Sequence, residues 1–397
     1  MTLGKVLLGD LFRVGSSKRV LKSEWKNEGI PFYRGREITR LSADGFVDNE
    51  LYISEEHFNE LATKYGAPSE GDIVITAIGT IGNSHIVRAY DKFYFKDASV
   101  LWLKKSADVS SEYINLWLKS PLFFKQLDKG NGATVDTLTI QKLQGVEINL
   151  PTLLEQQRIV TILDQAFEGI ATATANAKKN LANAREIFES YLQSIFAIKG
   201  DGWVEKSLGD LGTTQTGSTP STSDKANFGN YLPFIKPADF NSNGSLSYGN
   251  DGLSVQGATQ ARKIPPKSVL MVCIGATIGK CGWCDREIAT NQQINVLTPI
   301  DGISHKLIYY QMLTQNFQQR MLFKSGQATL PIINKSKWNS LTVTFPSTIQ
   351  EQQYLVARFD ELSKETKKLE AIYQQKLTLL DELKKSILNQ AFSGQLN

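Results

Sequence analysis

One phrase occurs twice in this chain of 397 residues, and each copy precedes a long run with helical spacing. PTLLEQQRIV begins at Pro151, and PSTIQEQQYLV begins at Pro346. After each copy, steps of four and three reach mostly apolar residues, and each position of the second run lies 196 residues beyond its counterpart. The first run comprises Ile159, Leu163, Ala166, Ile170, Ala173, Ala177, Asn180, Ala184, Ile187, Tyr191 and Ser194, and the second Leu355, Phe359, Leu362, Thr366, Leu369, Tyr373, Lys376, Leu380, Leu383, Ile387 and Gln390. Such spacing is typical of a coiled-coil seam and predicts two long helices.

The two seams differ in the size of their side chains. The small residues of the first seam are Ala166, Ala173, Ala177 and Ala184, and the large residues of the second are Leu362, Leu369, Tyr373 and Leu380. Small side chains interdigitate with large ones at native packing density. We therefore expect the two helices to pack on each other within the chain. We expect them to form an antiparallel coiled coil, because a duplicated chain can then close with approximate two-fold symmetry. The alternative is that each helix packs on a helix of another protein.

The start of each predicted helix carries the sequence of a capping box. Thr152 is followed three residues later by Glu155, and Thr348 by Glu351. In this motif the hydroxyl and the carboxylate each satisfy a backbone N–H that the first helical turn leaves free. Capping accounts for the glutamates, whereas the adjacent glutamine pairs are open to two interpretations, a solvated surface or a contact with another protein.

The duplication extends beyond the helices. LGDL occurs early in both halves, IPFYRGREI matches LPFIKPADF, and DIVITAIGTIGN matches SVLMVCIGATIGK, always in the same order. Self-similarity over such a distance indicates that one structural unit occurs twice. The sequence therefore predicts globular domains at 1–150 and 201–346, each followed by a helical spacer, at 151–200 and 347–397.

Each globular half mixes strand and helix signals. Short apolar runs between Gly, Asn and Pro turns predict strands at DIVITAI, SVLWLK, VEINLP, SVLMVCI and LTVTFP. Helices are expected over 112–127 and 306–322, and Pro121 must kink or split the first. The predicted fold class is α+β, with a twisted, mostly antiparallel sheet in each half and a pseudo-two-fold duplication of the whole.

Composition bounds the class of protein. The chain is 41% hydrophobic and 21% charged, with a net charge of +4, and no apolar run reaches the ~20 residues that span a bilayer. Three cysteines offer no disulfide framework, which suits a reducing cytoplasm, and we expect no membrane association. Between Arg13 and Arg40 lie eight Lys or Arg against three Glu, a local basic cluster suited to phosphate contact.

Motifs for catalysis or metal binding are not found. An amino-methyltransferase needs an Asn/Asp-Pro-Pro-aromatic loop, which is missing, and GATIGKC is one residue shorter than a phosphate loop. Cys281 and Cys284 form a C-x-x-C, but a structural zinc site needs four ligands and no second pair exists. We therefore expect no catalytic residue, no metal and no cofactor in this chain.

In this order and occurring twice, the motifs resemble those of the specificity subunit of type I restriction-modification systems. The resemblance rests on the Pro-x(3–4)-Glu-Gln-Gln helix starts, PFYRGREI and PFIKPADF, the Ile-Gly turns and LLDELKKSILNQAFSGQL at the C-terminus, and it covers essentially the whole chain. It implies two target-recognition domains separated by two conserved helices, with double-stranded DNA as ligand. It also implies methyltransferase subunits as partners, two in number and using S-adenosylmethionine, and restriction subunits with nuclease and translocase activity that use ATP and magnesium.

The resulting hypothesis is a non-catalytic DNA-recognition subunit: each half reads one part of a bipartite target, and the helices set the gap and dock the methyltransferase. One alternative is a coiled-coil tethering protein with two protein-binding heads, and another, disfavoured by the missing motifs, is an autonomous modification enzyme. The candidate DNA-binding residues are Ser17, Lys18, Arg19, Arg34, Arg36, Thr80, Asn83, Thr216, Ser218, Thr219, Ser221, Lys236, Thr277, Lys280, Gln292 and Gln293. The candidate partner-binding residues are Glu155, Gln156, Gln157, Arg158, Glu351, Gln352, Gln353 and Arg358.

Overall fold

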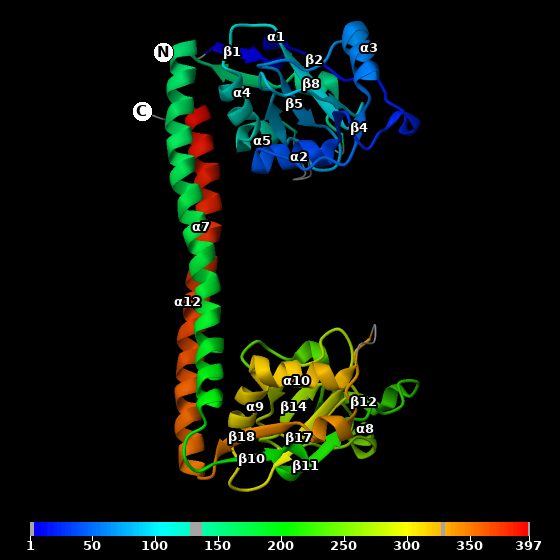
Figure 1. Ribbon diagram of the computed structural model, residues 1–397, viewed down its shortest axis with the longest axis vertical. Coiled ribbons are helices and arrows are strands. Elements are labelled where there is room, and N and C mark those ends of the chain that lie inside the picture. The colour runs from blue at the N-terminus through cyan, green and yellow to red at the C-terminus, as the bar shows by residue number, and fades with distance from the viewer. Residues whose placement is uncertain (1–3, 128–136, 327–329, 396–397) are drawn as a thin grey trace. The chain divides into compact units, whose positions relative to one another are not determined.

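A computed structural model describes residues 4–127, 137–326 and 330–395 (Figure 1). Contacts within the chain divide it into two compact units: unit 1 is Met1–Asn176 with Lys376–Asn397, and unit 2 is Ala177–Gln375. Each unit therefore contains one globular domain together with a part of each long helix. The boundaries between the two units fall inside the long helices, after Asn176 and after Gln375. The four segments predicted from the sequence instead separate each globular domain from the helix that follows it.

The globular domain of unit 1 is built on a four-stranded antiparallel sheet. Its strand order is β2 (Phe12–Gly15), β8 (Val100–Lys105), β5 (Ile73–Thr76) and β6 (Ser84–Ile86). A smaller sheet has the order β4 (Tyr52–Ile53), β3 (Ile30–Tyr33) and β7 (Tyr94–Phe95), in which β3 and β7 are parallel, and β1 (Gly4–Leu7) pairs with β9 (Glu147–Leu150). The helices are α1 (Leu8–Leu11), α2 (Gly35–Asp44), α3 (Glu55–Tyr65), α4 (Ser111–Leu118), α5 (Pro121–Leu127) and α6 (Ile140–Gln144).

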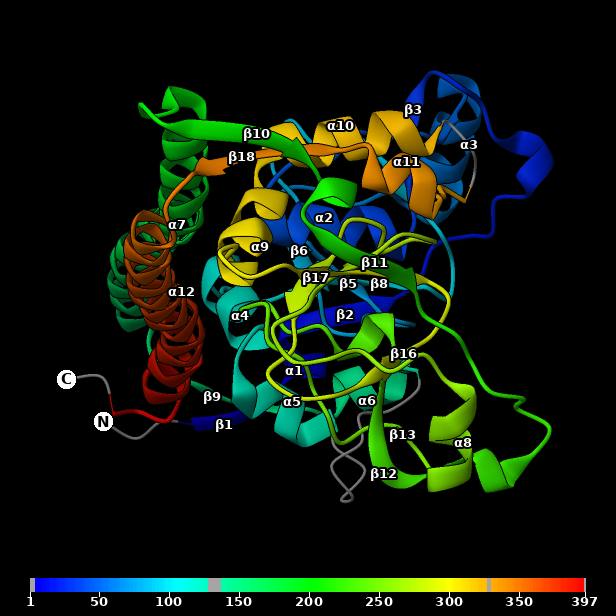
Figure 2. The same ribbon diagram turned by 90° about the horizontal axis from the view of Figure 1, so that it is seen from below.

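The globular domain of unit 2 repeats this topology. Its antiparallel sheet has the order β11 (Gly212–Thr216), β17 (Ile294–Pro299), β14 (Val269–Val272) and β15 (Cys281–Trp283). The smaller sheet is β13 (Gly252–Leu253), β12 (Phe228–Ile235) and β16 (Ala289–Thr290), again with one parallel pair, and β10 (Trp203–Ser207) pairs with β18 (Thr342–Pro346) (Figure 2). The helices are α8 (Val255–Gln260), α9 (His305–Leu313), α10 (Gln315–Ser325) and α11 (Lys335–Asn339). The α+β class and the internal duplication are thereby confirmed.

Each globular domain was expected to contain one helix, over 112–127 in the first and 306–322 in the second, and each of these is divided into two helices. Proline splits α4 from α5 at Pro121, as the sequence predicted. The expected single helix over 306–322 is wrong, because α9 ends at Leu313 and α10 begins at Gln315. No proline causes this second break. Instead Thr314 adopts an extended backbone and its hydroxyl accepts a hydrogen bond from the Phe317 N–H at 3.3 Å, which starts a new helix.

Two long helices follow the globular domains. Helix α7 spans Leu153–Ile198 with 46 residues, and α12 spans Ile349–Phe392 with 44. The hydroxyl half of each predicted capping box is present, since Thr152 and Thr348 accept from the N–H of Glu155 and Glu351 at 3.4 Å. The Glu155 carboxylate instead forms an ion pair with Arg158 at 3.0 Å.

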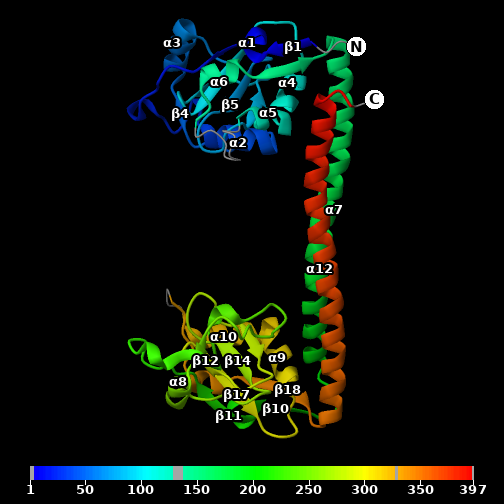
Figure 3. The ribbon, with the colours of Figure 1, turned by 180° about the vertical axis from the view of Figure 1, so that it is seen from behind.

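The two helices pack on each other in opposite directions. In unit 1, the ammonium group of Lys384 lies 5.1 Å from the ring centre of Phe167, so the early part of α7 meets the late part of α12. In unit 2, the rings of Tyr191 and Phe359 have centres 6.0 Å apart, so the late part of α7 meets the early part of α12. Within each unit the pairing is therefore antiparallel, as expected for a duplicated chain with approximate two-fold symmetry (Figures 1 and 3).

The seam is closed at some predicted positions and open at others. Ala177 and Ala184 are buried. In contrast, Ile187 is 49% exposed and Leu383 is 46% exposed, and these two residues are counterparts in the repeat. An apolar helix stripe wider than a two-stranded seam leaves its edge uncovered when only one partner helix is present.

None of the helices in the described part of the chain has both the length and the apolar character that crossing a membrane requires.

Candidate nucleic-acid interface

A buried carboxylate organises the first cluster of candidate residues, at the end of β3 in unit 1. Glu37 is 1% exposed and lies in the first turn of α2. It accepts hydrogen bonds from the backbone N–H of Arg34 at 2.9 Å and from its guanidinium at 2.9 and 3.1 Å. The Nε of Arg36 donates to the same carboxylate at 2.9 Å. The two arginines are thus held in place by Glu37 and only in part available to a ligand.

The charges of this cluster are coupled. Burial tends to raise the pKa of Glu37, but hydrogen bonds from the side chain and backbone of Arg34 and from Arg36 outweigh it and leave the pKa below its usual value. A second acid, Glu50, accepts from Arg36 Nη2 at 2.7 Å, and this hydrogen bond lowers the pKa of Glu50. Because Arg36 and Glu50 are both exposed, a phosphate could replace Glu50 as the partner of Arg36 without unburying a charge.

The Ile-Gly turn of unit 1 lies against the start of α2. The hydroxyls of Thr39, on α2, and Thr80, on the turn, are 3.0 Å apart, and the Asn83 side-chain amide donates to Thr39 Oγ1 at 3.3 Å. The same amide donates to the Thr80 carbonyl at 3.1 Å. Thr80 and Asn83 thus lie together, and Thr39 joins them to the arginine cluster. Thr39 was not among the residues predicted from the sequence, because no motif distinguishes a threonine inside an amphipathic helix.

A glycine brings this turn close to α5. Gly82 has a φ of +93°, and a Cβ at this position would lie 2.7 Å from Cε1 of Phe124. The counterpart in unit 2 is Gly279, with a φ of +89° and Gln318 Oε1 at 2.3 Å from its would-be Cβ. Only glycine fits such a backbone and such an approach. Both Ile-Gly turns are therefore fixed on the domain core rather than free in solvent.

The remaining candidates of unit 1 follow β2 and lie at the end of β7. Ser17 Oγ donates to the Phe95 carbonyl at 2.6 Å, and the Lys18 N–H donates to the hydroxyl of Tyr94 at 3.0 Å. Arg19 pairs with Asp97 at 3.1 Å, with 72% of the arginine side chain exposed. Because β3 and β7 are parallel neighbours, their carboxyl ends lie side by side. Residues 17–19, which contact the end of β7, therefore lie at the same end of the small sheet as Arg34.

In unit 2 the candidates gather where β11 ends and β17 begins. Thr216 Oγ1 donates to Asn295 Oδ1 at 2.7 Å, and Thr219 Oγ1 donates to Gln292 Oε1 at 2.6 Å. Gln293 accepts from the side chain of Asn291 at 2.9 Å. This cluster offers hydroxyls and amides where unit 1 offers guanidinium groups.

Arg262, which was not among the residues predicted from the sequence, adds a cation to this cluster. Its guanidinium donates to the carbonyl of Thr216 at 2.7 Å, and its backbone N–H donates to Ser218 Oγ at 3.1 Å. Arg262 lies just after α8, far from the candidates in sequence, so only the fold brings it here. Ser221, farther along the same loop, shares a hydrogen bond with Ser223 at 2.8 Å.

The other candidates of unit 2 surround the second Ile-Gly turn and the end of β12. Lys236 forms an ion pair with Asp251 at 2.8 Å, and its backbone N–H donates to the buried Asp239 at 2.7 Å. Lys280 reaches back to the carbonyl of Phe240 at 3.4 Å, while Thr277 is exposed at the tip of the turn. The pair Lys236–Asp239 repeats the relation of Arg34 to Glu37, with a carboxylate again fixing the residue after the strand.

Thiol chemistry is disfavoured in unit 2. Cys281 lies on β15, and Cys273 and Cys284 are buried as it is. Burial raises the pKa of Cys273 to about 12 and that of Cys284 to about 11, which disfavours the thiolate that zinc binding or redox chemistry requires. In the part of the chain that is described, no group of three or more His, Cys, Asp or Glu could hold a metal ion.

The glutamine pairs at the helix starts have two different environments. Gln156 is 2% exposed and Gln352 is 0% exposed, and each side chain bonds to backbone groups of its own unit. Their interpretation as partner-binding residues is therefore replaced by a structural role. Gln157 and Gln353, one residue later, are exposed. Glu351, Arg158 and Arg358 are also exposed, whereas Glu155 is half-buried.

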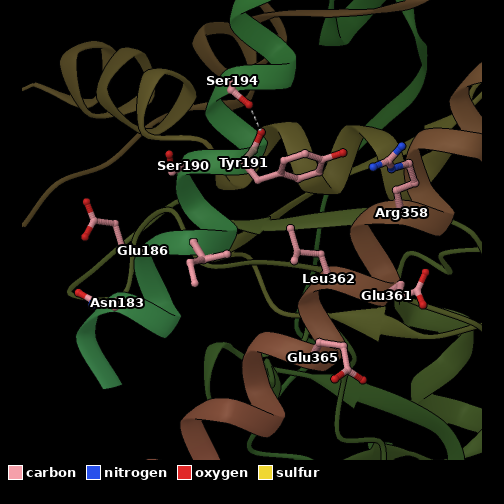
Figure 4. A pocket seen from close by; sticks show the side chains of 10 residues that line it. Asn183, Glu186, Ser190, Tyr191, Ser194, Arg358, Glu361, Leu362 and Glu365 are labelled. Carbon is pink, nitrogen blue, oxygen red and sulfur yellow. Dashed lines mark hydrogen bonds between the residues drawn. The ribbon is translucent and has the colours of Figure 1, made fainter. Parts of the chain in front are cut away.

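A groove lies between the two long helices in unit 2, next to Arg358. Its volume is about 960 Å³. Helix α7 and α12 present three carboxylates to it, Glu186, Glu361 and Glu365, with Leu362 between the helices (Figure 4). Asn183, Ile187, Ser190, Tyr191, Ser194 and Arg358 complete the lining. The groove thus combines an apolar floor with an acidic rim.

Comparison with known proteins identifies a matching family model and proteins of similar sequence. The family model of the type I restriction modification DNA specificity domain matches residues 3–183 and again 200–379. A putative type I restriction enzyme specificity subunit of Haemophilus influenzae is 32% identical over 200 residues, which cover 48% of this chain and 49% of the relative. The HindI specificity subunit of the same organism is 37% identical over 150 residues, covering 37% and 32%. These matches thus span about half or less of the curated relatives.

Two solved structures share the fold along almost the whole chain. One belongs to a study of complex assembly and conformational transition of the type I R-M system, with a TM-score of 0.79, 18% identity and coverage of 99% and 98% of the two chains. The other is the HsdS subunit of Thermoanaerobacter tengcongensis, with a TM-score of 0.61, 19% identity and coverage of 99% and 97%. With its two matched copies, its duplicated α+β domains and its paired helices, this chain belongs to the family of type I restriction modification DNA specificity domains.

Proposed function

We propose that this chain is the DNA-recognition subunit of a type I restriction-modification complex, in which each globular domain reads one part of a bipartite duplex. The observation that carries the proposal is the repeated Ile-Gly turn, fixed on the domain core by Gly82 or Gly279. Polar side chains gather beside each turn, among them Asn83 in unit 1 and Gln293 in unit 2. Amides of this kind pair with base edges, and the neighbouring hydroxyls and backbone N–H groups suit phosphates.

The two domains are proposed to read different sequences. Unit 1 combines two arginines, Arg34 and Arg36, with Asn83. Unit 2 combines hydroxyls and glutamines with one arginine, Arg262. Arginine favours guanine, and asparagine or glutamine favours adenine. An asymmetric, two-part target follows from this difference in chemistry.

Chemistry on the DNA is proposed to reside in partner subunits. We infer that this chain is not catalytic, and that two methyltransferase subunits carrying S-adenosylmethionine dock on the long helices. Restriction subunits that use ATP and magnesium would complete the assembly in the cytoplasm. For docking we propose the exposed residues Gln157, Arg158, Gln353 and Arg358 and the acidic groove beside Arg358.

The experiment that tests the proposal exchanges one domain. Residues 201–346 are replaced by the matching block of a relative, and the variant is expressed in a cell that also contains the methyltransferase. The methylated target sequence is then determined across the genome of that cell. The expected result is a change in one half of the target only. Duplex binding should also weaken steeply with salt, because phosphate contacts release counterions. A complex with no sequence preference at any salt concentration would instead favour the tethering alternative.

A further inference from the structure

The internal repeat provides a counterpart for the groove of unit 2. Adding 196 to its α7 residues and subtracting 196 from its α12 residues gives positions that all fall in unit 1. These positions, which we call the unit 1 helix surface, are Leu379, Glu382, Leu383, Ser386, Ile387 and Gln390 of α12 with Ile162, Gln165, Ala166 and Gly169 of α7. If identical subunits dock at equivalent places on a duplicated chain, these are the two places to compare.

The two surfaces differ in charge. The unit 2 groove presents Glu186, Glu361 and Glu365 against the single cation Arg358. The counterparts of Glu361, Glu365 and Arg358 in unit 1 are the uncharged residues Gln165, Gly169 and Ile162. Glu382, the counterpart of Glu186, is therefore the one charged residue of the unit 1 helix surface. All three glutamates of the groove are exposed, so their carboxylates are accessible to a partner. The groove therefore attracts a cationic partner, and the unit 1 helix surface does so far less.

The two surfaces also differ in exposed apolar area. On the unit 1 helix surface Leu379 is 54% exposed and Leu383 is 46% exposed. In the groove the counterpart of Leu379 is Asn183, so Ile187, at 49%, is the apolar side chain that stays most open. Burial of apolar surface gains free energy that salt does not screen, whereas attraction between exposed charges falls as the Debye length shortens.

We propose that the two docking places are not equivalent: the unit 2 groove takes a helix of the methyltransferase whose apolar strip is flanked by Lys or Arg, and holds it partly by charge. The unit 1 helix surface takes the same helix mainly through its leucines. This proposal rests on the proposed function, in which two methyltransferase copies bind this chain. Rising salt then releases the copy in unit 2 first and leaves a complex with one methyltransferase.

The test counts methyltransferase copies on the full chain, without DNA, by native mass spectrometry and light scattering from about 50 mM to 1 M salt. Two copies are expected at low salt and one at high salt. The triple variant Glu186→Gln, Glu361→Gln and Glu365→Gln should weaken binding of the salt-sensitive copy by about tenfold at low salt, the scale of a few exposed ion pairs. The variant Leu379→Ser with Leu383→Ser should instead weaken the salt-resistant copy.

The matched control is Glu168→Gln, which removes one exposed carboxylate of α7 outside both surfaces and should leave both copies in place. Loss of both copies over the same salt range, or a triple variant with unchanged salt dependence, would overturn the inference while leaving the proposed function intact. A chain that binds no methyltransferase even at low salt would overturn the proposed function itself.

Discussion

The side-chain carbonyl of Gln156 accepts a hydrogen bond from the backbone N–H of Ser110 at 2.9 Å, and thereby joins the start of α7 to the start of α4. The amide of the same side chain donates to the Pro151 carbonyl at 2.9 Å. Unit 2 repeats the arrangement, where Gln352 accepts from the N–H of Ser304 at 2.8 Å and donates to the Pro346 carbonyl at 2.9 Å. The duplicated Glu-Gln-Gln phrase thus encodes the joint between each globular domain and its helix.

Replacing the buried glutamine should weaken this joint. Gln156→Met keeps the size of the side chain but leaves the Ser110 N–H without its partner, which costs about 1–3 kcal/mol of the free energy of unfolding. Gln352→Met should do the same in unit 2. The exposed Gln157→Met serves as control and should change stability by less than about 0.5 kcal/mol. Urea unfolding measures the difference, and equal effects of Gln156→Met and Gln157→Met would contradict the role of the joint.

The second residue of α4 and the second residue of α9 each face an aspartate of the adjacent long helix, but they carry opposite charges. In unit 2, Lys306 pairs with Asp360 at 2.7 Å, and the Tyr310 hydroxyl donates to the same carboxylate at 2.5 Å. In unit 1, the counterparts are Glu112 and Asp164, and the pKa of Asp164 is raised by burial and then by the Glu112 charge. One domain is therefore bound to its helix by a charge pair, and the other faces it with two like charges.

Charge exchange should reverse this asymmetry. Glu112→Lys should stabilise unit 1 by about 0.5–1 kcal/mol, and Lys306→Glu should destabilise unit 2 by about 1–2 kcal/mol. Because the folded pKa of Asp164 is raised, the repulsion is present at neutral pH and is relieved as pH falls through that pKa. The gain from Glu112→Lys should therefore shrink in acid. Unfolding at pH 7 and at pH 4 checks this, and a gain that is independent of pH would argue against the like-charge pair.

His305 should make unit 2 sensitive to acid. Burial, with the charges of Lys306 and Lys267, lowers its pKa from 6.5 to about 4. The unfolded chain therefore binds a proton below about pH 6.5 that the folded chain refuses until about pH 4, so stability falls across this window. His305→Gln should recover about 1–2 kcal/mol at pH 4.5 relative to pH 7.5, after allowance for the partial exposure of the ring. A variant whose pH profile parallels that of the unaltered chain would refute this assignment.

The continuous helices should set the gap between the two parts of the DNA target. Removing 170–176 from α7 together with 376–382 from α12 keeps the seam in phase and shortens each helix by one heptad, about 10.5 Å. At about 3.4 Å per base pair, the gap should shrink by roughly three base pairs. The spacing of methylated half-sites across a genome is the measurement. An active variant with an unchanged gap would show that the helices do not set it.

The sequence by itself determined the features that repeat with a period. The four-three spacing predicted both long helices and their pairing, because burial of an apolar stripe needs a partner stripe. The duplicated phrases predicted two similar α+β domains, and Pro121 located one helix break through its missing N–H.

Tertiary structure decided which polar residues meet. Thr39 and Arg262 became part of the candidate interface through strand order and helix placement, which no local pattern encodes. Gln156 and Gln157 are adjacent and identical in type, yet one is buried and the other exposed, because helical rotation of about 100° per residue turns only one of them toward Ser110. Hydrogen-bond geometry between distant segments, rather than residue type, separates a structural side chain from one that is free to bind.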